Sequence, residues 1–303
     1  MNVSFGTEPL EFLVGATAVG KTQTALELAE RLDFEIVSMD SMLVYRGMDV
    51  GTAKPSPEER ARVPHHGIDL VDPPERYDVK SYLADCAQAL TEIRARGRRA
   101  LFCGGTGFYL KALAHGLFEG PPADLELRAE LSARYDAEGP EATFAELARV
   151  DPVLAGRLHP NDKKRVLRGL EVHRQTGRAL SELQAEWKRP LPPHRIVGLE
   201  RPTEELDRRI DSRVELMLDA GWIDEVQRIE ATTGFGVTSG AALGYPEVRA
   251  HLAGELERSE LAPTIAQKTR RFARKQATWL RSFDVTWVAA DAPLEDVLTH
   301  FQV

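Results

Sequence analysis

Gly15-Ala-Thr-Ala-Val-Gly-Lys-Thr22 reads G-x-x-x-x-G-K-[ST], the pattern of the phosphate-binding loop, or P-loop. An apolar run over 11–14 precedes it and a helical pattern over 21–31 follows it, which is the strand–loop–helix order that the motif requires. Glycines let successive backbone N–H groups and the helix N-terminus surround an anion, and the lysine adds a positive charge. A polyphosphate site is therefore predicted at Gly15, Ala16, Thr17, Ala18, Val19, Gly20, Lys21 and Thr22, with the Thr22 hydroxyl as a ligand for Mg²⁺.

The remainder of the chain has the composition of a globular protein. Of its 303 residues 43% are hydrophobic and 28% are charged, and no apolar run reaches the length of a membrane span. The N-terminus shows no basic-then-apolar signal pattern, and two cysteines are too few for a disulfide framework or a zinc set. We therefore expect a protein of the reducing cytoplasm that has no membrane partner.

Short apolar runs that alternate with helical patterns predict a parallel α/β sheet. Further strands are expected over 34–39, 99–103, 195–199 and 285–289. Residues 64–69, which include two adjacent histidines, are expected to be loop, and residues 120–194 show helical patterns only. The predicted fold is α/β, a P-loop NTPase-like parallel sheet flanked by helices. In this prediction residues 1–119 and 195–303 form the catalytic core, and residues 120–194 form an all-helical insertion domain.

Two predicted strands end in polar residues. Asp40 directly follows the second strand. The ligand crevice of open α/β sheets lies outside such strand ends, so this aspartate is placed to face a ligand. A role in a turn or as a helix cap is the alternative. The third strand ends in Gly104-Gly-Thr106, where ATPases and GTPases with a P-loop usually carry an acidic residue for Mg²⁺. These glycines suit either close approach to a ligand or tight strand-to-helix packing, and the threonine offers a hydroxyl.

Basic side chains gather in two segments of a chain whose net charge is −8. Residues 261–281 contain six basic residues and no acidic one, with Phe272 and Trp279 interleaved, and residues 163–168 contain four more. A chain with this net charge cannot attract nucleic acid over its whole surface. The pattern therefore predicts local contacts with a phosphate backbone.

Three classes of protein are compatible with these features. A small-molecule kinase would hold ATP in the P-loop, and Asp40 would take a proton from the acceptor hydroxyl. A transferase would instead hold the diphosphate of an activated donor, and the basic segments would suit an acceptor with a phosphate backbone. An RNA-binding switch that only senses a nucleotide is the third class, and the missing strand-end acid argues against it.

Besides the P-loop, distinctive sequence occurs in the segments 40–55 (DSMLVYRGMDVGTAKP), 64–66, 104–109, 159–162, 165–168 with 170–172, 244–245 and 269–281. In these segments the chain resembles the bacterial tRNA dimethylallyltransferase (isopentenyl-diphosphate:tRNA isopentenyltransferase) family. The segment 40–55 is far more specific than the P-loop. One departure is Gly169 in place of the usual Ala, which is expected to weaken its helix by about 1 kcal/mol.

The resemblance implies transfer of a dimethylallyl group from dimethylallyl diphosphate to N6 of adenine 37 in tRNA, with release of diphosphate. The P-loop and Mg²⁺ would stabilise the leaving diphosphate, since negative charge develops there. Asp40 would accept the proton of the amine. Thr106 and Arg213 would contact the diphosphate by family analogy.

The resemblance also implies how tRNA is held. The helical insertion would grip the anticodon stem-loop while the core holds the extruded base. The tRNA contacts carried over from the family are Asp40, Ser41, Met42, Leu43, Arg128, Lys164, Arg165, Val166, Leu167, Arg168, Arg274, Lys275, Gln276 and Arg281. We expect the protein to act as a monomer.

Overall fold

The computed structural model describes residues 5, 8–118, 120–186 and 192–302, and the chain forms two compact units. The first unit comprises Met1–His115 and Pro192–Val303, and the second comprises Gly116–Leu191. The boundaries predicted at 120 and 194 lie slightly C-terminal to those of the second unit. Residues 119 and 187–191, which adjoin these boundaries, lie outside the described residues.

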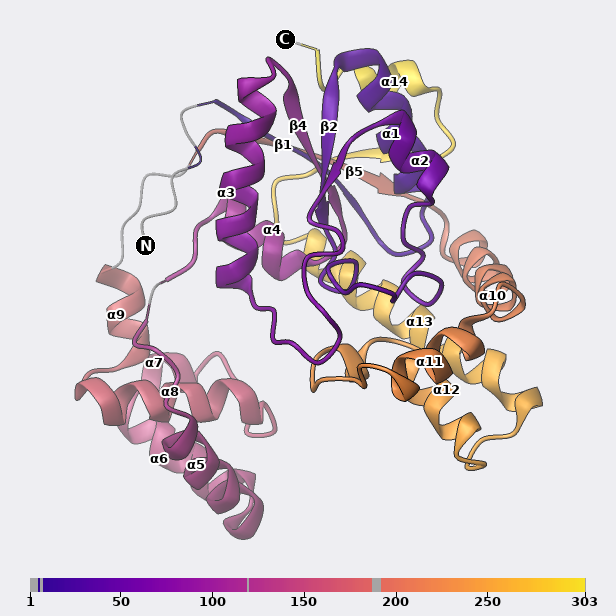
Figure 1. Ribbon diagram of the computed structural model, residues 1–303. Helices are drawn as coiled ribbons and strands as arrows, with labels where there is room; N and C mark the ends of the chain where they lie inside the picture. The colour runs from indigo at the N-terminus through magenta and orange to yellow at the C-terminus, as the bar shows by residue number, and fades with distance from the viewer. Residues whose placement is uncertain (1–4, 6–7, 119, 187–191, 303) are drawn as a thin grey trace. The chain divides into compact units, whose positions relative to one another are not determined.

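A six-stranded sheet, parallel throughout, forms the centre of the first unit (Figure 1). Its strands lie in the order β3-β2-β4-β1-β5-β6. They are β1 (Leu10–Gly15), β2 (Phe34–Met39), β3 (His65–His66), β4 (Arg99–Gly104), β5 (His194–Glu200) and β6 (Thr286–Ala289). The predicted α/β fold with a parallel sheet is confirmed.

The short edge strand β3 is a correction, because residues 64–69 were expected to be loop. His65 and His66 pair in parallel register with Ile36 and Val37 of β2. Two residues are too few to show a hydrophobic period, so the sequence pattern carries no signal for such a strand. The pairing arises because β2 offers an open edge on that side.

Helices cover both faces of the sheet, as the strand order requires. The connection from β1 to β2 through α1 (Lys21–Leu32) runs toward the β3 edge, and the connection from β3 to β4 through α3 (Val79–Ala95) runs back. Parallel crossovers are right-handed, so the two helices must lie on opposite faces. Figure 1 shows this arrangement. The P-loop therefore sits between β1 and α1 at the carboxyl edge of the sheet.

The strands β1 and β2 are buried at every position. Strands covered on both faces read as nearly continuous apolar runs, which is why they stand out in the sequence. Each also buries one carboxylate near its start: Arg99 Nε lies 3.1 Å from Glu11, and Arg96 bonds Glu35 at 2.9 and 2.8 Å. An unpaired carboxylate there would be costly, so these ion pairs stabilise the amino-terminal ends of the strands, which lie opposite to the P-loop.

The other helices of the first unit surround this sheet. They are α2 (Pro57–Arg62), α4 (Gly107–Ala114), α10 (Thr203–Asp219), α11 (Trp222–Ala231), the 3₁₀ turn η1 (Ser239–Ala241), α12 (Tyr245–Leu252), α13 (Arg258–Leu280) and α14 (Leu294–Leu298). α13 contains the predicted basic segment and packs along α10. Within the described parts of the chain, every helix is too short or too polar to cross a bilayer.

The second unit is entirely helical in its described part. Its helices are α5 (Leu125–Glu138), α6 (Pro140–Val150), α7 (Pro152–Ala155), α8 (Lys163–Thr176) and α9 (Leu180–Glu186). Leu131, Leu147 and Leu170 are fully buried in its core. A Cβ at Gly169 would lie 2.6 Å from Leu147 Cδ1 and 2.8 Å from Leu154 Cδ2. The glycine at this position is thus explained by close packing of α8.

Candidate active site

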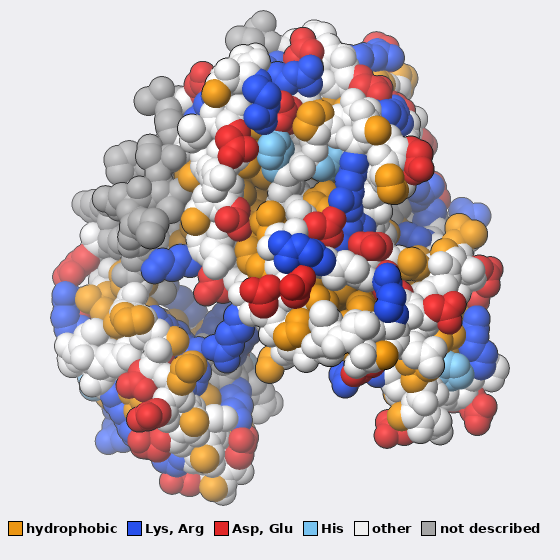
Figure 2. Space-filling model, viewed as in Figure 1, with side chains coloured by type: hydrophobic (Ala, Val, Ile, Leu, Met, Phe, Trp, Pro, Cys, Tyr) orange, Lys and Arg blue, Asp and Glu red, His pale blue; other side chains and the backbone are white. Residues whose placement is uncertain are grey.

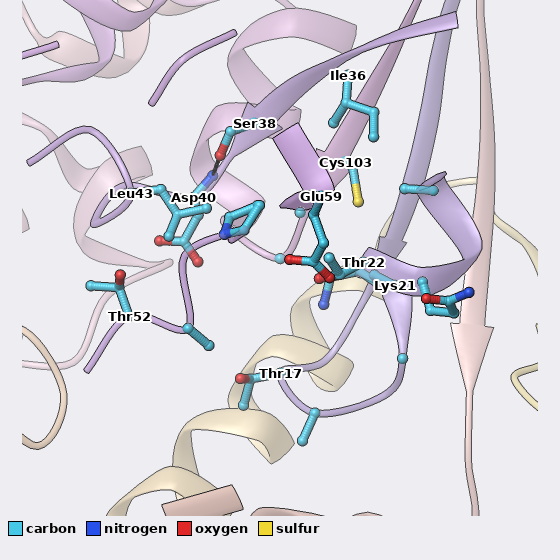
Figure 3. Close-up of a pocket in the computed structure, with 18 of the residues that line it drawn as sticks. Thr17, Lys21, Thr22, Ile36, Ser38, Asp40, Leu43, Thr52, Glu59 and Cys103 are labelled. Carbon is cyan, nitrogen blue, oxygen red and sulfur yellow. Dashed lines mark hydrogen bonds between the residues drawn. The ribbon is translucent and has the colours of Figure 1, made fainter. Parts of the chain in front are cut away.

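One cavity of about 410 Å³ lies at the carboxyl ends of β1, β2 and β4, where open α/β sheets bind their ligands. Its walls come from the P-loop, from the loop after β2, and from α10 and α13. Figure 3 shows Thr17, Lys21 and Thr22 on the P-loop side, with Asp40 and Leu43 on the side of the following loop. The P-loop and the predicted base therefore face the same cavity.

The P-loop backbone has the conformation that its glycines allow. A Cβ on Gly15 would lie 2.8 Å from the carbonyl oxygen of Leu199, so the close approach of β1 to β5 requires glycine. Ala18 and Gly20 adopt left-handed conformations with φ of 64° and 118°. α1 begins at Lys21, and no described side chain caps its N-terminus. The first-turn N–H groups are therefore available to an anion.

Lys21 lies over the P-loop itself. Its Nζ donates hydrogen bonds to the carbonyl oxygens of Gly15 at 3.0 Å and Ala16 at 2.8 Å. Burial lowers the pKa of Lys21 to about 8, because the ammonium group loses hydration there. A phosphate group beside Nζ would favour the charged form again. The lysine is thus placed to bind an anion and to take up a proton as it does so.

Two arginines of α10 donate hydrogen bonds to the P-loop. Arg213 Nη2 donates to Thr17 Oγ1 at 2.6 Å, and Arg209 Nε donates to the Ala18 carbonyl at 2.9 Å. Burial lowers the pKa of Arg213, and its Nε is buried with no hydrogen-bond partner among the described residues. Such a donor is costly unless a ligand or water satisfies it. Arg213, predicted to contact the diphosphate, thus lines the cavity and keeps one buried donor without a partner among the described residues.

Gln276 of α13 ties the P-loop to the end of β4. Its Oε1 accepts a hydrogen bond from the Thr17 N–H at 2.9 Å, and its Nε2 donates to the Gly105 carbonyl at 3.0 Å. The sequence predicted this glutamine as a tRNA contact. Both ends of its amide are engaged within the protein, so its observed role is to position the P-loop.

Asp40 stands at the carboxyl end of β2, as predicted. Its Oδ1 accepts a hydrogen bond from the Met42 N–H at 2.8 Å, which fixes the carboxylate at the cavity wall. Burial raises the pKa of Asp40, and the charges of Lys21 and Arg213 oppose the rise. A carboxylate that is less acidic than usual and held in a cavity has the properties of a general base.

The two glycines at the end of β4 are required by packing, and both also line the cavity. A Cβ on Gly104 would overlap the Met39 carbonyl, and one on Gly105 would lie 2.9 Å from the Gly15 carbonyl oxygen. Thr106 Oγ1 accepts a hydrogen bond from the Ser41 N–H at 3.3 Å. Thr106 is not among the described residues that line the cavity, so its observed contact is with the loop after β2.

Glu225 of α11 anchors the loop after β2, a role that no pattern in the sequence predicts. The carboxylate is 4% exposed and accepts hydrogen bonds from the N–H groups of Asp49, Val50 and Gly51 at 2.7, 2.7 and 3.1 Å. The Tyr245 hydroxyl donates a fourth bond at 2.7 Å. An acid that binds backbone N–H groups leaves no motif, because any sequence supplies those donors.

Lys54 holds the same loop from within. Its buried Nζ donates to the Tyr45 carbonyl at 2.6 Å and lies 2.7 Å from both Asp49 Oδ1 and Asp69 Oδ1. Hydrogen bonds to charged groups are the stronger ones, and a buried ammonium needs such partners. The polar residues of the segment 40–55 therefore serve mainly to fold the loop that carries Asp40.

Acids from neighbouring helices partly neutralise the basic helix α13. Lys268 pairs with Glu247 of α12 and Arg270 with Asp211 of α10; Arg274 lies 2.7 Å from Asp207 of α10. The basic residues of this segment with no ion pair among the described residues are Arg271, Lys275 and Arg281. Figure 2 likewise shows Lys/Arg and Asp/Glu side chains intermingled on the face it displays. The predicted phosphate contacts thus have fewer free cations than the sequence suggested.

In the second unit a buried glutamate organises two of the predicted tRNA contacts. Glu171, fully buried, accepts hydrogen bonds from Arg128 at 2.7 Å and from Arg168 at 2.9 Å. Val166 and Leu167 were also predicted as contacts, but their side chains are 0% and 6% exposed within the core. That part of the prediction is wrong for the side chains, because the two residues lie on the inward face of α8.

The donor set fits Mg²⁺ bound largely through substrate. In the described parts of the chain, no group of three or more His, Cys, Asp or Glu side chains could hold a metal ion. The Thr22 hydroxyl and the Asp40 carboxylate are oxygen donors in the cavity wall. Mg²⁺ keeps several waters and binds through one or two protein oxygens together with phosphates, so a sparse site of this kind suits it.

The fold and the cavity are those of a P-loop enzyme that transfers a chemical group between substrates. Lysine, arginine and free backbone N–H groups give one end of the cavity the properties of a phosphate site, and Asp40 lines the same cavity. Comparison with known proteins narrows this class. Residues 43–283 match the family described as IPP transferase, and residues 9–64 match the isopentenyl transferase family.

Curated relatives match over nearly the whole chain. The chain is 42% identical over 296 residues to tRNA dimethylallyltransferase 2 of Geotalea uraniireducens, covering 96% of this chain and 95% of the relative. It is 46% identical over 281 residues to the tRNA dimethylallyltransferase of Halorhodospira halophila, covering 91% and 90%. The chain belongs to the IPP transferase family, in which these relatives are tRNA dimethylallyltransferases.

Solved structures agree with this assignment. The tRNA isopentenylpyrophosphate transferase of Bacillus halodurans is 37% identical, with a TM-score of 0.71, and the match covers 97% of this chain and 94% of that one. A eukaryotic dimethylallyltransferase acting on tRNA is 26% identical, with a TM-score of 0.79, and the match covers 97% and 76%. Nearly the whole chain thus shares the fold of these transferases.

Proposed function

We propose that this protein transfers a dimethylallyl group from dimethylallyl diphosphate to N6 of adenine 37 in tRNA and releases diphosphate. The observation that carries the proposal is that Lys21, Arg213 and Asp40 line one cavity. The first two suit an anionic leaving group, and the third suits an amine that must lose a proton. The relatives, named as tRNA dimethylallyltransferases, support the nature of both substrates.

Departure of the diphosphate is the step that the P-loop would assist. The allylic C1–O bond breaks, and its electron pair leaves with the diphosphate. Lys21, the unpaired Nε of Arg213 and the N–H groups at the start of α1 would stabilise that charge, because they are fixed before the reaction starts. Mg²⁺, held by Thr22 and the diphosphate oxygens, would supply further Lewis-acid stabilisation.

Attack by adenine is the step that Asp40 would assist. The N6 lone pair is delocalised into the ring, so the amine becomes a useful nucleophile only as it loses a proton. The N6–C1 bond forms while one N6 proton passes to the Asp40 carboxylate. The raised pKa of Asp40 helps this transfer, since a stronger base takes the proton more readily.

Both units carry cations that could hold the tRNA backbone. In the first unit these are Arg271, Lys275 and Arg281, and in the second Lys164 and the Glu171-bound arginines. Because tRNA is the acceptor, we place the reaction in the cytoplasm.

The test is incubation of the full chain with unmodified tRNA, Mg²⁺ and dimethylallyl diphosphate, followed by mass spectrometry of the nucleosides. We expect adenosine in which a C₅H₉ group replaces one hydrogen, a net gain of C₅H₈. Transcripts with a different base at position 37 should remain unmodified. A parallel reaction with ATP and free nucleosides tests the kinase class. Phosphorylated nucleoside without prenylated adenosine would overturn the proposal.

A further inference from the structure

An exposed aromatic ring, Phe272, forms part of the cavity wall. Its side chain lies on α13 and is 43% exposed. Single exposed apolar residues are common on protein surfaces, so exposure alone means little. Phe272 differs because it lines the same cavity as Asp40 and Arg213. A large ring left open to solvent inside a reaction cavity is a candidate contact for a substrate.

The position of this ring is fixed relative to the P-loop. Phe272 and Gln276 are one turn apart on α13 and therefore share a face of the helix. The Gln276 amide is hydrogen-bonded to both Thr17 and Gly105, so this turn of the helix cannot shift independently of the P-loop. The ring is thus held at the cavity by rigid elements.

The second aromatic residue of the basic segment serves a different purpose. Trp279 packs so closely on Gly107 that a Cβ there would overlap its ring, and it meets Phe283 edge to face at 5.8 Å. Phe272 has no aromatic partner of this kind among the described residues. Its neighbours Arg271 and Lys275 are exposed and form no ion pair there. They could contact the phosphates that flank a bound nucleotide.

We infer that the Phe272 ring stacks on the target adenine when this base has left its own stack. The inference rests on the proposed function, which requires such a base in the cavity. An extruded base loses its stacking neighbours, and an aromatic side chain replaces them regardless of the base's hydrogen-bonding edge. The N6 edge therefore stays free to face Asp40. Phe272 is then a substrate-binding residue that orients the acceptor.

The first test is kinetic. Phe272→Ala should lower kcat/KM for tRNA by about 5- to 150-fold, the range that corresponds to the loss of one base–aromatic stack. Phe272→Tyr should retain most of the activity, because it keeps the ring. Leu252→Ala is the matched control: Leu252 is 41% exposed on α12 of the same unit and does not line the cavity. Thermal unfolding of each variant shows whether its fold is intact.

The second test reports on the base itself. An anticodon stem-loop with 2-aminopurine in place of adenine 37 cannot react at N6, and this base loses fluorescence when it stacks. Emission in the complex should be low with wild type and Phe272→Tyr but high with Phe272→Ala. Equal emission with wild type and Phe272→Ala, or kcat/KM values within twofold, would overturn the inference. The proposed function fails separately, if wild type forms no prenylated adenosine.

Discussion

Binding of dimethylallyl diphosphate should weaken as the pH rises above about 8, because Lys21 loses its charge there. The ordinary pKa of a lysine is 10.5, and burial lowers that of Lys21 to about 8. At pH 9 only about 9% of the ligand-free protein would carry the charged side chain. If the charged form alone binds well, the apparent affinity falls about tenfold between pH 7 and pH 9. With an ordinary pKa the loss would be about 3%.

The assay is calorimetric titration at pH 7, 8 and 9 in buffers of different ionisation enthalpy. Above pH 8 the heat should reveal uptake of about one proton for each ligand bound, because the diphosphate restores the charge of Lys21. Lys21→Arg is the matched control, since an arginine stays charged throughout this range. The affinity of this variant should not change with pH.

An affinity of wild type that is constant from pH 7 to 9 would refute this reasoning. So would an equal decline in Lys21→Arg, which would assign the effect to the ligand or to another group. The lowered pKa of Lys21 also makes the free energy of unfolding depend on pH. Between pH 8 and 10.5 the unfolded chain holds more protons at this lysine, so its contribution to the free energy of unfolding should rise with pH.

Three further predictions concern the base, the loop anchor and the basic helix. Asp40→Asn should lower single-turnover rates by about 10²–10⁴-fold with unchanged diphosphate affinity, and a rate near wild type would exclude Asp40 as the base. Glu225→Gln should lower the free energy of unfolding, measured in urea, by about 2–4 kcal/mol, because an amide cannot satisfy three backbone donors. A loss below about 1 kcal/mol would show that Glu225 does not anchor the loop after β2. Lys275→Ala should reduce the slope of log tRNA affinity against log salt concentration by about 0.7–0.9 units. Arg274→Ala should reduce this slope less, because Asp207 already neutralises that arginine. Equal slopes for these two variants would show that the ion pair opens on binding.

Much of the fold could be predicted because its signals are local. The P-loop motif spans eight consecutive residues, and β1 and β2 are apolar runs bounded by breaks. Asp40 was located in the same way, since its place directly after a strand determines the edge of the sheet on which it lies. Each of these inferences needs only a short window of sequence.

The remainder depends on residues that are distant in the sequence. Asp207 and Arg274 are 67 residues apart, so the neutralisation of the basic helix could not be seen by counting charges along it. Glu225 binds the Asp49 N–H across 176 residues. The amide of Gln276 reaches the P-loop across 259 residues. Such pairs form only when the sheet has placed the helices, and no periodicity encodes them.

The ring of Trp222 has a consequence for how this chain can evolve. The ring is 2% exposed, and a Cβ on Gly51 or on Gly244 would overlap it. Substitution of either glycine alone is therefore strongly disfavoured, because even a methyl group has no room there. A smaller residue at 222 would have to appear first, at the cost of a cavity in the packing. We expect the three positions to be inherited together, so that a gene with a side chain at 51 or 244 also encodes a smaller residue at 222.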